Sequence, residues 1–253
     1  MFYSKKIKKF QNIKHCFYTK KNGFSDGIYQ SLNCSLGSND KKANVIKNLE
    51  FVSKNIGVKN NNLILMNQTH SNKVIVVDGL NKSLSRFNSD ALITDLKDVA
   101  ISVLTADCVP IILYDEVNKI IGCIHAGWKG AISGIIENTI QEFSKLNKKI
   151  KITAAVGPCI GSKSYEVDSD FYNNFLNISK ENQIFFEKTT NNKFLFDIRK
   201  YVNKRLIDCE VLNIDNIELD SCKDDKNFFS YRRSQKLNEI DYGRCISTIC
   251  LKN

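Results

Sequence analysis

The stretch VAISVLTADCVPIILYDEVNKIIGCIHAGWKG, residues 99–130, decides the fold because three short apolar runs alternate in it with polar breaks. The runs cover residues 99–104, 109–114 and 120–124. They are rich in Ile and Val, as buried strands are. Runs of the same kind cover residues 63–66, 73–78 and 150–156. The sequence therefore predicts a core of closely spaced strands.

Helical periodicity marks other segments. An apolar stripe over residues 45–56 predicts a helix that ends at Gly57, a residue type common just after helix C-termini. Apolar residues at helical spacing predict a second helix over residues 130–146. Two further helices are expected over residues 169–176 and 197–209. Because strands and helices do not alternate strictly, we expect an α/β protein with mixed sheets.

Three side chains that can together hold one metal ion lie at polar breaks beside the strands: His70, Cys108 and His125. They occur in NQTHSNKVIVV, TADCVPIILY and GCIHAGWKG, and the whole chain has only 3 histidines. Two imidazoles and one thiolate form a borderline-soft set that suits Zn²⁺, with copper as a competitor. A fourth tetrahedral position would stay open for water or substrate. The pattern therefore favours a metal-dependent enzyme.

Each candidate ligand also has a plainer interpretation. A single histidine is usually a hydrogen-bonded structural residue, and free cysteine is among the most buried side chains. The flanking residues Gln68, Asp107 and Lys129 are not explained by a core, which favours a site. A non-catalytic zinc protein stays open as an alternative. Cys123 could fill the fourth position, because it lies two residues from His125 and would share its face on a strand.

Composition indicates a soluble globular protein. The chain has 253 residues, 42% of them hydrophobic, and we expect one compact domain over residues 1–253. The N-terminus MFYSKKIKKF lacks the apolar segment of a signal peptide, and no apolar run is long enough to cross a membrane. The 9 cysteines are odd in number and irregularly spaced, which favours reduced thiols in a cytoplasm over disulfides.

The formal net charge of +10 does not by itself indicate a nucleic-acid-binding protein. The lysines are scattered, and no RNP motif or zinc-finger spacing is present. The charge would instead help to attract small anions such as phosphate. We therefore expect small-molecule partners, with neither nucleic acid nor membrane among them, and a monomer or weak homo-oligomer.

Cys159 is a candidate for a different chemistry. The segment GPCIG, residues 157–161, follows a strand-like run and reads as G-x-C-x-G, a thiol version of the nucleophile elbow. His125 could act as the base if it held no metal. The alternative is a tight turn that shapes a pocket wall, because Pro158 stiffens the segment and no helix pattern follows Gly161.

Taken together, these motifs resemble those of the YfiH-like family, also known as the multicopper polyphenol oxidase or laccase-domain family. The resemblance covers nearly the whole sequence and begins with TKKNGFSDGIYQSLNCSLGSND, residues 19–40. It continues through NQTHSNKV, SDALITD, TADCVPIILYD, IHAGWKG, AAVGPCIG, SYEVD, FFSYRR and GRCIS, in that order. By this resemblance His70, Cys108 and His125 fall on the family's metal-ligand positions. It also implies an α/β/β/α sandwich.

One motif departs from the family pattern. The family usually reads TRxGGVS, whereas this chain reads TKKNGFS over residues 19–25. Lys20 keeps the charge of arginine but loses the planar fork that grips phosphate or carboxylate, which puts an anion contact there in question. Asn22 replaces a glycine, and asparagine is the other residue type that best tolerates a left-handed backbone.

The resemblance implies a purine nucleoside phosphorylase acting on adenosine, inosine, guanosine and methylthioadenosine, with adenosine deaminase activity as well. Phosphorolysis needs an anion pocket, and deamination needs a metal-activated water. We assign the phosphate to Arg232, whose fork suits it, with a surface salt bridge as the alternative. Asp107 would orient a histidine or transfer a proton. Tyr165 would contact the purine, and Asn33 and Gln68 are further expected substrate contacts.

Two other activities stay open. The family's older label is copper-dependent oxidation of phenols, yet laccases need several copper ions and 3 histidines are too few for them. Relatives are also linked to peptidoglycan editing, the removal of a misincorporated serine from a muropeptide precursor. That amide hydrolysis could use zinc-bound water or Cys159.

Overall fold

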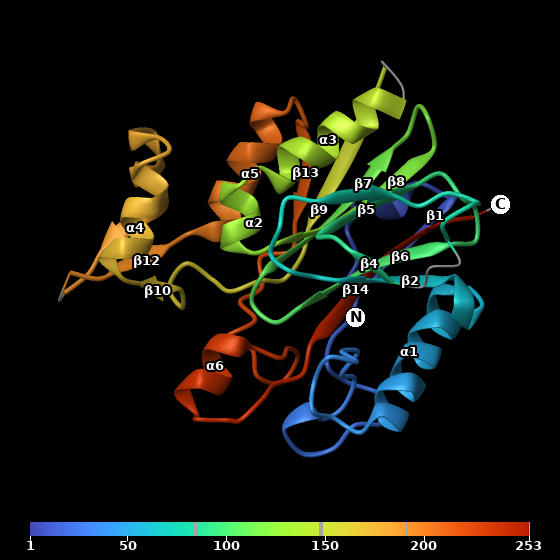
Figure 1. The fold of residues 1–253 in the computed structure, drawn as a ribbon, viewed down its shortest axis with the longest axis horizontal. Helices are drawn as coiled ribbons and strands as arrows, with labels where there is room; N and C mark the ends of the chain where they lie inside the picture. The colour runs from blue at the N-terminus through green and yellow to red at the C-terminus, as the bar shows by residue number, and fades with distance from the viewer. Residues whose placement is uncertain (83–85, 147–148, 191, 253) are drawn as a thin grey trace.

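Two mixed β-sheets packed face to face form the centre of the molecule in the computed structural model, which describes residues 1–82, 86–146, 149–190 and 192–252 (Figure 1). The five-stranded sheet has the order β1 (Ile13–Phe17), β14 (Cys245–Leu251), β6 (Ala100–Thr105), β2 (Leu63–Asn67), β4 (Arg86–Asn88). The six-stranded sheet has the order β13 (Asn213–Asn216), β9 (Ile152–Val156), β7 (Val109–Asp115), β8 (Ile120–Ala126), β5 (Ala91–Thr94), β3 (Val74–Val76).

Helices cover both outer faces of this pair of sheets. Helix α1 (Lys42–Ile56) packs on the five-stranded sheet, while α3 (Ile135–Leu146) and α5 (Ile198–Asp208) pack on the six-stranded sheet (Figure 1). The shorter helices are α2 (Trp128–Ile132), α4 (Ser169–Leu176) and α6 (Tyr231–Lys236), with 3₁₀ turns at Ile7–Lys9, Gly27–Tyr29, Asn60–Asn62 and Lys180–Phe185. A small third sheet has the order β10 (Glu166–Val167), β12 (Phe194–Phe196), β11 (Phe186–Lys188). The expected mixed α/β fold is confirmed.

The apolar runs of the sequence form the layer between the two large sheets. Every residue of β7, β8 and β14 is buried, as expected for strands covered on both faces. Ile101 and Val103 from one sheet share this layer with Ile112 and Ile121 from the other. Full burial of such a side chain contributes roughly 1.5–3 kcal/mol, so this layer is a main source of stability.

The helix predictions are mostly confirmed. Helix α1 ends at Ile56, and Gly57 follows it with a left-handed φ of 82°. Helices α4 and α5 match the expected segments to within a residue at each end. The single helix expected over residues 130–146 is wrong, because α2 and α3 are separate there. Gly134 between them has a φ of +90°, which an α-helix cannot accommodate.

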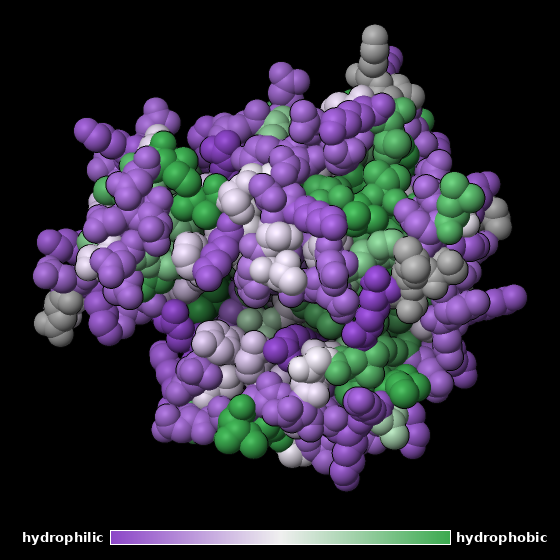
Figure 2. Space-filling model, in the orientation of Figure 1, coloured by the Kyte–Doolittle hydropathy of each residue, from purple (hydrophilic) through white to green (hydrophobic). Residues whose placement is uncertain are grey.

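The surface in Figure 2 is mainly hydrophilic, and it is hollowed between the part of the molecule that carries α4 and the part that carries α6. In the described part of the chain, no helix combines the length and apolarity needed to cross a membrane.

Chain crossings between the two sheets position the polar breaks of the sequence. Strand β6 belongs to the five-stranded sheet and β7 to the six-stranded sheet, so the turn that carries Cys108 crosses between them. The loop from β2 to β3, which carries His70, makes the same crossing. His125 lies near the end of β8, where its partner in β7 is Pro110. Three distant segments therefore meet at one edge of the sandwich.

Candidate metal centre

His70, Cys108 and His125 come together as the sequence predicts. Cys108 Sγ lies 3.7 Å from His70 Nε2, and the two imidazole centroids are 4.8 Å apart. The potential ligand atoms of all three residues lie within 4.8 Å of one another. In the described part of the chain, no other group of three His, Cys, Asp or Glu side chains is arranged to hold a metal ion.

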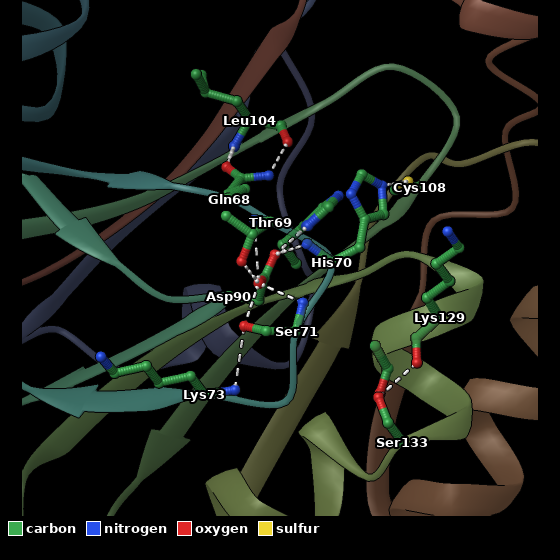
Figure 3. Close-up of polar contacts among 12 residues, drawn as sticks. Gln68, Thr69, His70, Ser71, Lys73, Asp90, Leu104, Cys108, Lys129 and Ser133 are labelled. Atoms are coloured by element: carbon green, nitrogen blue, oxygen red, sulfur yellow. Dashed lines mark hydrogen bonds and ion pairs between the residues drawn. The ribbon is translucent and has the colours of Figure 1, made fainter.

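Asp90 organises two of the three ligands, and the sequence reasoning missed it. Its carboxylate is fully buried. One oxygen accepts a 2.8 Å hydrogen bond from Nδ1 of His125, and the same oxygen accepts the backbone N–H of His70 at 3.1 Å. The other oxygen accepts the backbone N–H and the hydroxyl of Ser71 at 2.7 and 2.6 Å (Figure 3). Asp90 thus leaves Nε2 of His125 available to a metal.

A signal for Asp90 was present in the sequence. It directly precedes the apolar run ALIT of β5, and a carboxylate at a buried strand end requires hydrogen-bond donors. Those donors come from the loop at residues 69–71, which is distant in sequence. The pairing therefore depends on tertiary structure.

Two residues at the site have left-handed backbones that are unfavourable for residues other than glycine. The φ angle is 59° at His70 and 88° at Asp107, which immediately precedes Cys108. Such conformations persist only where surrounding contacts hold them, and they concentrate at functional sites. Asp90 holds the first through backbone N–H groups. Hydrogen bonds that the Asp107 carboxylate accepts hold the backbone of Asp107 in its conformation.

Gly127 provides the space in which the ligands meet. A Cβ atom at this position would lie 2.5 Å from Cδ2 of His70 and 3.1 Å from Sγ of Cys108. The first distance is far below van der Waals contact, so any side chain at this position would displace the His70 ring. The backbone of Gly127 has ordinary φ and ψ values, so the requirement for glycine is steric.

Replacing Gly127 with alanine is expected to lower the Zn²⁺ affinity by about 10- to 100-fold, the range found when metal ligands lose their support. A competition titration with a chromogenic chelator measures this affinity. Gly79→Ala is the matched control, because a Cβ there meets no atom of the described residues within 4 Å and metal binding should be unchanged. Parental affinity in Gly127→Ala would contradict the steric role.

The residues present fit a single transition-metal ion. Two imidazole nitrogens and one thiolate match the donor set of three-ligand zinc sites with an open position. Tetrahedral zinc places such donors about 3.3–3.6 Å apart, so an adjustment on the order of 1 Å would complete the geometry. Cys123 does not supply a fourth ligand. It is buried in the layer between the sheets and is not part of the His70, Cys108 and His125 group.

The electrostatics of the metal-free site favour a thiolate at Cys108. Burial raises the pKa of this thiol, but the positive charge of His125 and hydrogen bonds from both histidines outweigh it and lower the pKa to about 6. Burial lowers the pKa of His125, but the Cys108 charge and the Asp90 hydrogen bond raise it to about 9. Burial likewise opposes ionisation of Asp90, yet hydrogen bonds from His125 and Ser71 hold its pKa below the ordinary value.

Alkylation of Cys108 in metal-free protein should therefore follow an unusually acidic pH profile. The thiolate is the reactive form, and its fraction rises through a midpoint of about 6. The rate with iodoacetamide, followed by mass spectrometry of the Cys108 peptide, is expected to rise from pH 5 to about pH 7 and then level off. An ordinary thiol would continue to accelerate up to about pH 8.5, and that result would contradict the assignment. Zinc should protect Cys108.

Two cavities adjoin the three ligands, and His70 and Cys108 line both. The larger cavity has a volume of about 530 Å³ and includes the aromatic side chains of Trp128, Tyr165 and Phe171. The smaller cavity has a volume of about 340 Å³, and His125 reaches only this one.

Besides His70 and Cys108, three of the expected site residues lie at the larger cavity: Asp107, Tyr165 and Arg232. The Arg232 guanidinium lies 5.3 Å from the Tyr165 ring centroid, and its Nη1 donates to the backbone oxygen of Glu166. Asp107 accepts hydrogen bonds from the Ser221 and Ser230 hydroxyls and from the backbone N–H of Arg232. Both of its oxygens are therefore engaged, and among the residues that the structure describes no hydrogen bond joins it to a histidine.

Gln68 and Asn33 have structural partners. Gln68 lines the smaller cavity, but its amide makes two 2.7 Å hydrogen bonds to the backbone of Leu104, which tie the end of β2 to β6 (Figure 3). Asn33 is fully buried and lines neither cavity. Its side chain accepts from the backbone N–H groups of Ser35 and Arg244, so it orders the wall of the smaller cavity from behind.

Cys159 is not placed where a catalytic nucleophile would have to lie. Its thiol is fully buried, burial raises its pKa to about 12, and it lines neither cavity. Neutral, inaccessible thiols are poor nucleophiles, so the structure does not support the cysteine hydrolase. Lys129 lies on α2 against Trp128 and lines neither cavity.

The motif at residues 19–25 lies apart from both of these cavities. Asn22 has a φ of 67°, so it adopts the left-handed conformation that its replacement of a glycine predicts. Lys20 lies 5.7 Å from the Phe229 ring centroid and lines neither cavity.

The fold and the site together define a class: a mixed α/β sandwich whose sheet-crossing loops present an open His–Cys–His centre. The chain belongs to the family described as multi-copper polyphenol oxidoreductase laccase, whose model matches residues 14–252. This confirms the YfiH-like resemblance.

Individual relatives agree with this membership. The chain is 33% identical over 217 residues to purine nucleoside phosphorylase RC0672 of Rickettsia conorii, which covers 84% of this chain and 89% of the relative. It is 26% identical over 249 residues to purine nucleoside phosphorylase YlmD of Bacillus subtilis, with coverage of 93% and 87%. The crystal structure of the hypothetical protein YfiH from Bacillus licheniformis superimposes with a TM-score of 0.87 at 26% identity, with coverage of 95% and 93%.

Proposed function

We propose that the protein is a zinc-dependent purine nucleoside phosphorylase that cleaves adenosine, inosine, guanosine and methylthioadenosine and also deaminates adenosine. The carrying observation is the open centre of His70, Cys108 and His125 at the wall of a cavity large enough for a nucleoside. Relatives named purine nucleoside phosphorylase support the reaction class.

The larger cavity suits a purine. Its lining combines aromatic faces, from Trp128, Tyr165 and Phe171, with polar groups that can fix the orientation of a ring. Aromatic side chains stabilise flat ligands by stacking, and Arg232 stacked over Tyr165 extends the surface with a cation. A small number of polar groups in a largely apolar hollow is typical of small-molecule sites.

The protein's own groups prepare the reaction. A zinc ion held by the three ligands would supply a Lewis acid for the sugar or leaving group in phosphorolysis and for a water in deamination. Asp90 fixes the tautomer of His125. Asp107 holds α6, and with it Arg232, against the Cys108 turn, so we assign it the orienting role.

Copper-dependent phenol oxidation is the weaker reading. A multicopper centre needs more imidazoles than this site offers, and His15, the remaining histidine, is buried in β1. Its Nε2 accepts the backbone N–H of Ser4. All 9 cysteines are free thiols, which supports action in a reducing compartment such as the cytoplasm.

Base release from inosine by metal-quantified protein, with and without inorganic phosphate, tests the function. We expect free hypoxanthine and ribose 1-phosphate in equal amounts only when phosphate is present. Adenosine, guanosine and methylthioadenosine are tested in the same way, and conversion of adenosine to inosine is followed without phosphate. Protein loaded with one zinc per chain that releases no base from any of these nucleosides would refute the proposal.

A further inference from the structure

The two cavities meet at the metal centre but differ in charge. The smaller cavity is lined by two cations, Arg86 and Arg244, and by no carboxylate of the described residues. The larger cavity carries three carboxylates, those of Asp107, Glu166 and Asp168, beside its cations. A phosphate dianion would be repelled by the carboxylates of the larger cavity. The smaller cavity therefore provides the better anion site.

Arg244 is held in position for such a role. Its backbone N–H donates to the buried side chain of Asn33 at 3.0 Å, and its Nη1 donates to the Ser35 hydroxyl at 3.2 Å and to the Tyr242 backbone oxygen at 3.4 Å. Its guanidinium lies 4.3 Å from the Tyr242 ring centroid. It forms no salt bridge with any described residue; its charge acts on the Asp241 carboxylate, which does not line the cavity. No hydrogen bond of its Nε or Nη2 occurs among the described residues. A guanidinium group that is held in place and has unengaged N–H groups is well suited to bind the oxygens of phosphate.

Arg232, the anion contact expected from the sequence, is placed less favourably. Its Nη1 donates to the Glu166 backbone oxygen at 2.7 Å and its guanidinium lies over the Tyr165 ring, contacts of the same kind as those of Arg244. The difference lies in the carboxylates of Glu166 and Asp168, which line the cavity of Arg232 and oppose the binding of an anion there. We therefore assign Arg232 to the stacking surface.

We propose that the smaller cavity is the phosphate subsite, with Arg244 as its anchor and Arg86 as a second cation, and that the purine occupies the larger cavity. The inference rests on the proposed phosphorylase function and revises the assignment of phosphate to Arg232. It explains why His70 and Cys108 line both cavities: the sugar lies at their junction, between the nucleophile and the base.

The arrangement fixes the course of the reaction. A phosphate oxygen forms a bond to C1′ of the ribose from the smaller cavity while the bond from C1′ to N9 breaks. The electron pair of the broken bond leaves with the purine in the larger cavity. The proton that phosphate loses on forming the ester balances the proton that the purine gains. Because attack and departure occur on opposite sides of C1′, a β-nucleoside yields α-ribose 1-phosphate.

Initial rates with phosphate and inosine varied separately test the subsite. In Arg244→Ala the KM for phosphate is expected to rise by about 10- to 100-fold, the effect of losing charge-assisted hydrogen bonds, with the KM for inosine changed by less than about threefold. Arg244→Lys should lie between this variant and the parent, because it keeps the charge without the fork. Arg232→Ala is the matched comparison, with the larger effect expected on inosine.

Thermal unfolding and metal content confirm that each variant is folded and loaded, and Arg244→Lys carries the test if the alanine variant does not fold. A larger rise in the phosphate KM for Arg232→Ala, or an equal rise in both alanine variants, would overturn the subsite assignment. So would β-ribose 1-phosphate as the product by NMR.

Failure of the proposed function gives a different result. If the parent releases no base, inorganic phosphate is titrated into the zinc-loaded protein by calorimetry. Binding to the parent that is lost in Arg244→Ala supports the anion subsite without phosphorolysis. Equal binding by both proteins, or none by the parent, rejects it.

Discussion

Replacing Cys108 with alanine is expected to lower the Zn²⁺ affinity by more than about 100-fold and to abolish phosphate-dependent base release. Losing only the groups that support a ligand already costs about 10- to 100-fold, and loss of a ligand should cost more. The variant also leaves His70 and His125 without the thiolate that lies between the two cavities. Metal analysis after exhaustive dialysis and the hypoxanthine assay measure the two effects.

Cys159→Ala is the control for this substitution. Its thiol is buried outside both cavities, so metal content and turnover should be retained, with some loss of stability from the vacated space. A Cys108→Ala protein that keeps one zinc per chain and releases base at the parental rate would refute the assigned centre. Loss of base release in a folded Cys159→Ala protein that retains its metal would show that Cys159 contributes to catalysis despite its burial.

Replacing Asp90 with asparagine is expected to weaken zinc binding by about 10- to 100-fold and to destabilise the fold by about 2–4 kcal/mol. An amide has one acceptor oxygen, whereas Asp90 uses one oxygen for His125 and the other for Ser71. The NH₂ group of the new asparagine would therefore face a hydrogen-bond donor, either Nδ1 of His125 or the Ser71 hydroxyl. If it faces His125, the proton moves to Nε2, the atom that the metal requires.

Asp115→Asn is the control that separates the loss of zinc affinity from the loss of fold stability. Asp115 is also fully buried and also accepts backbone N–H groups, from Val117 and Lys151, but it lies outside both cavities. The Asp115→Asn variant should lose about as much stability in chemical denaturation as Asp90→Asn, but it should keep the parental zinc affinity. A shift of the His125 tautomer in ¹⁵N NMR spectra should occur only in Asp90→Asn. Unchanged zinc affinity in Asp90→Asn would contradict its positioning role.

The strands and the three candidate metal ligands could be predicted from the sequence because their signals are local. The apolar runs on either side of Cys108 are long enough to identify β6 and β7, and histidines are scarce enough for His70 and His125 to stand out. The break between α2 and α3 was missed because the apolar stripe continues past Gly134, whose left-handed φ depends on its tertiary setting.

The supporting residues were harder to predict because their partners are distant in sequence. Asp90 acts through the loop at residues 69–71 and through His125, and none of these contacts follows from spacing. Asp107 was noticed only for its place beside Cys108, while its actual partners lie more than 100 residues further along the chain. The charge contrast between the cavities likewise requires the folded surface.

The carboxylate of Asp90 has a consequence for how the ion is acquired. Because protein hydrogen bonds hold the loop of His70 and the ring of His125 in place, the proposed site should exist before any ion binds, unlike a zinc finger that folds around its metal. Removing the ion should leave the fold intact. The metal-free site should then bind the divalent cation that is most available and most tightly held. Copper exceeds zinc in that ranking. The history of a preparation, as much as its sequence, should therefore determine which chemistry it displays.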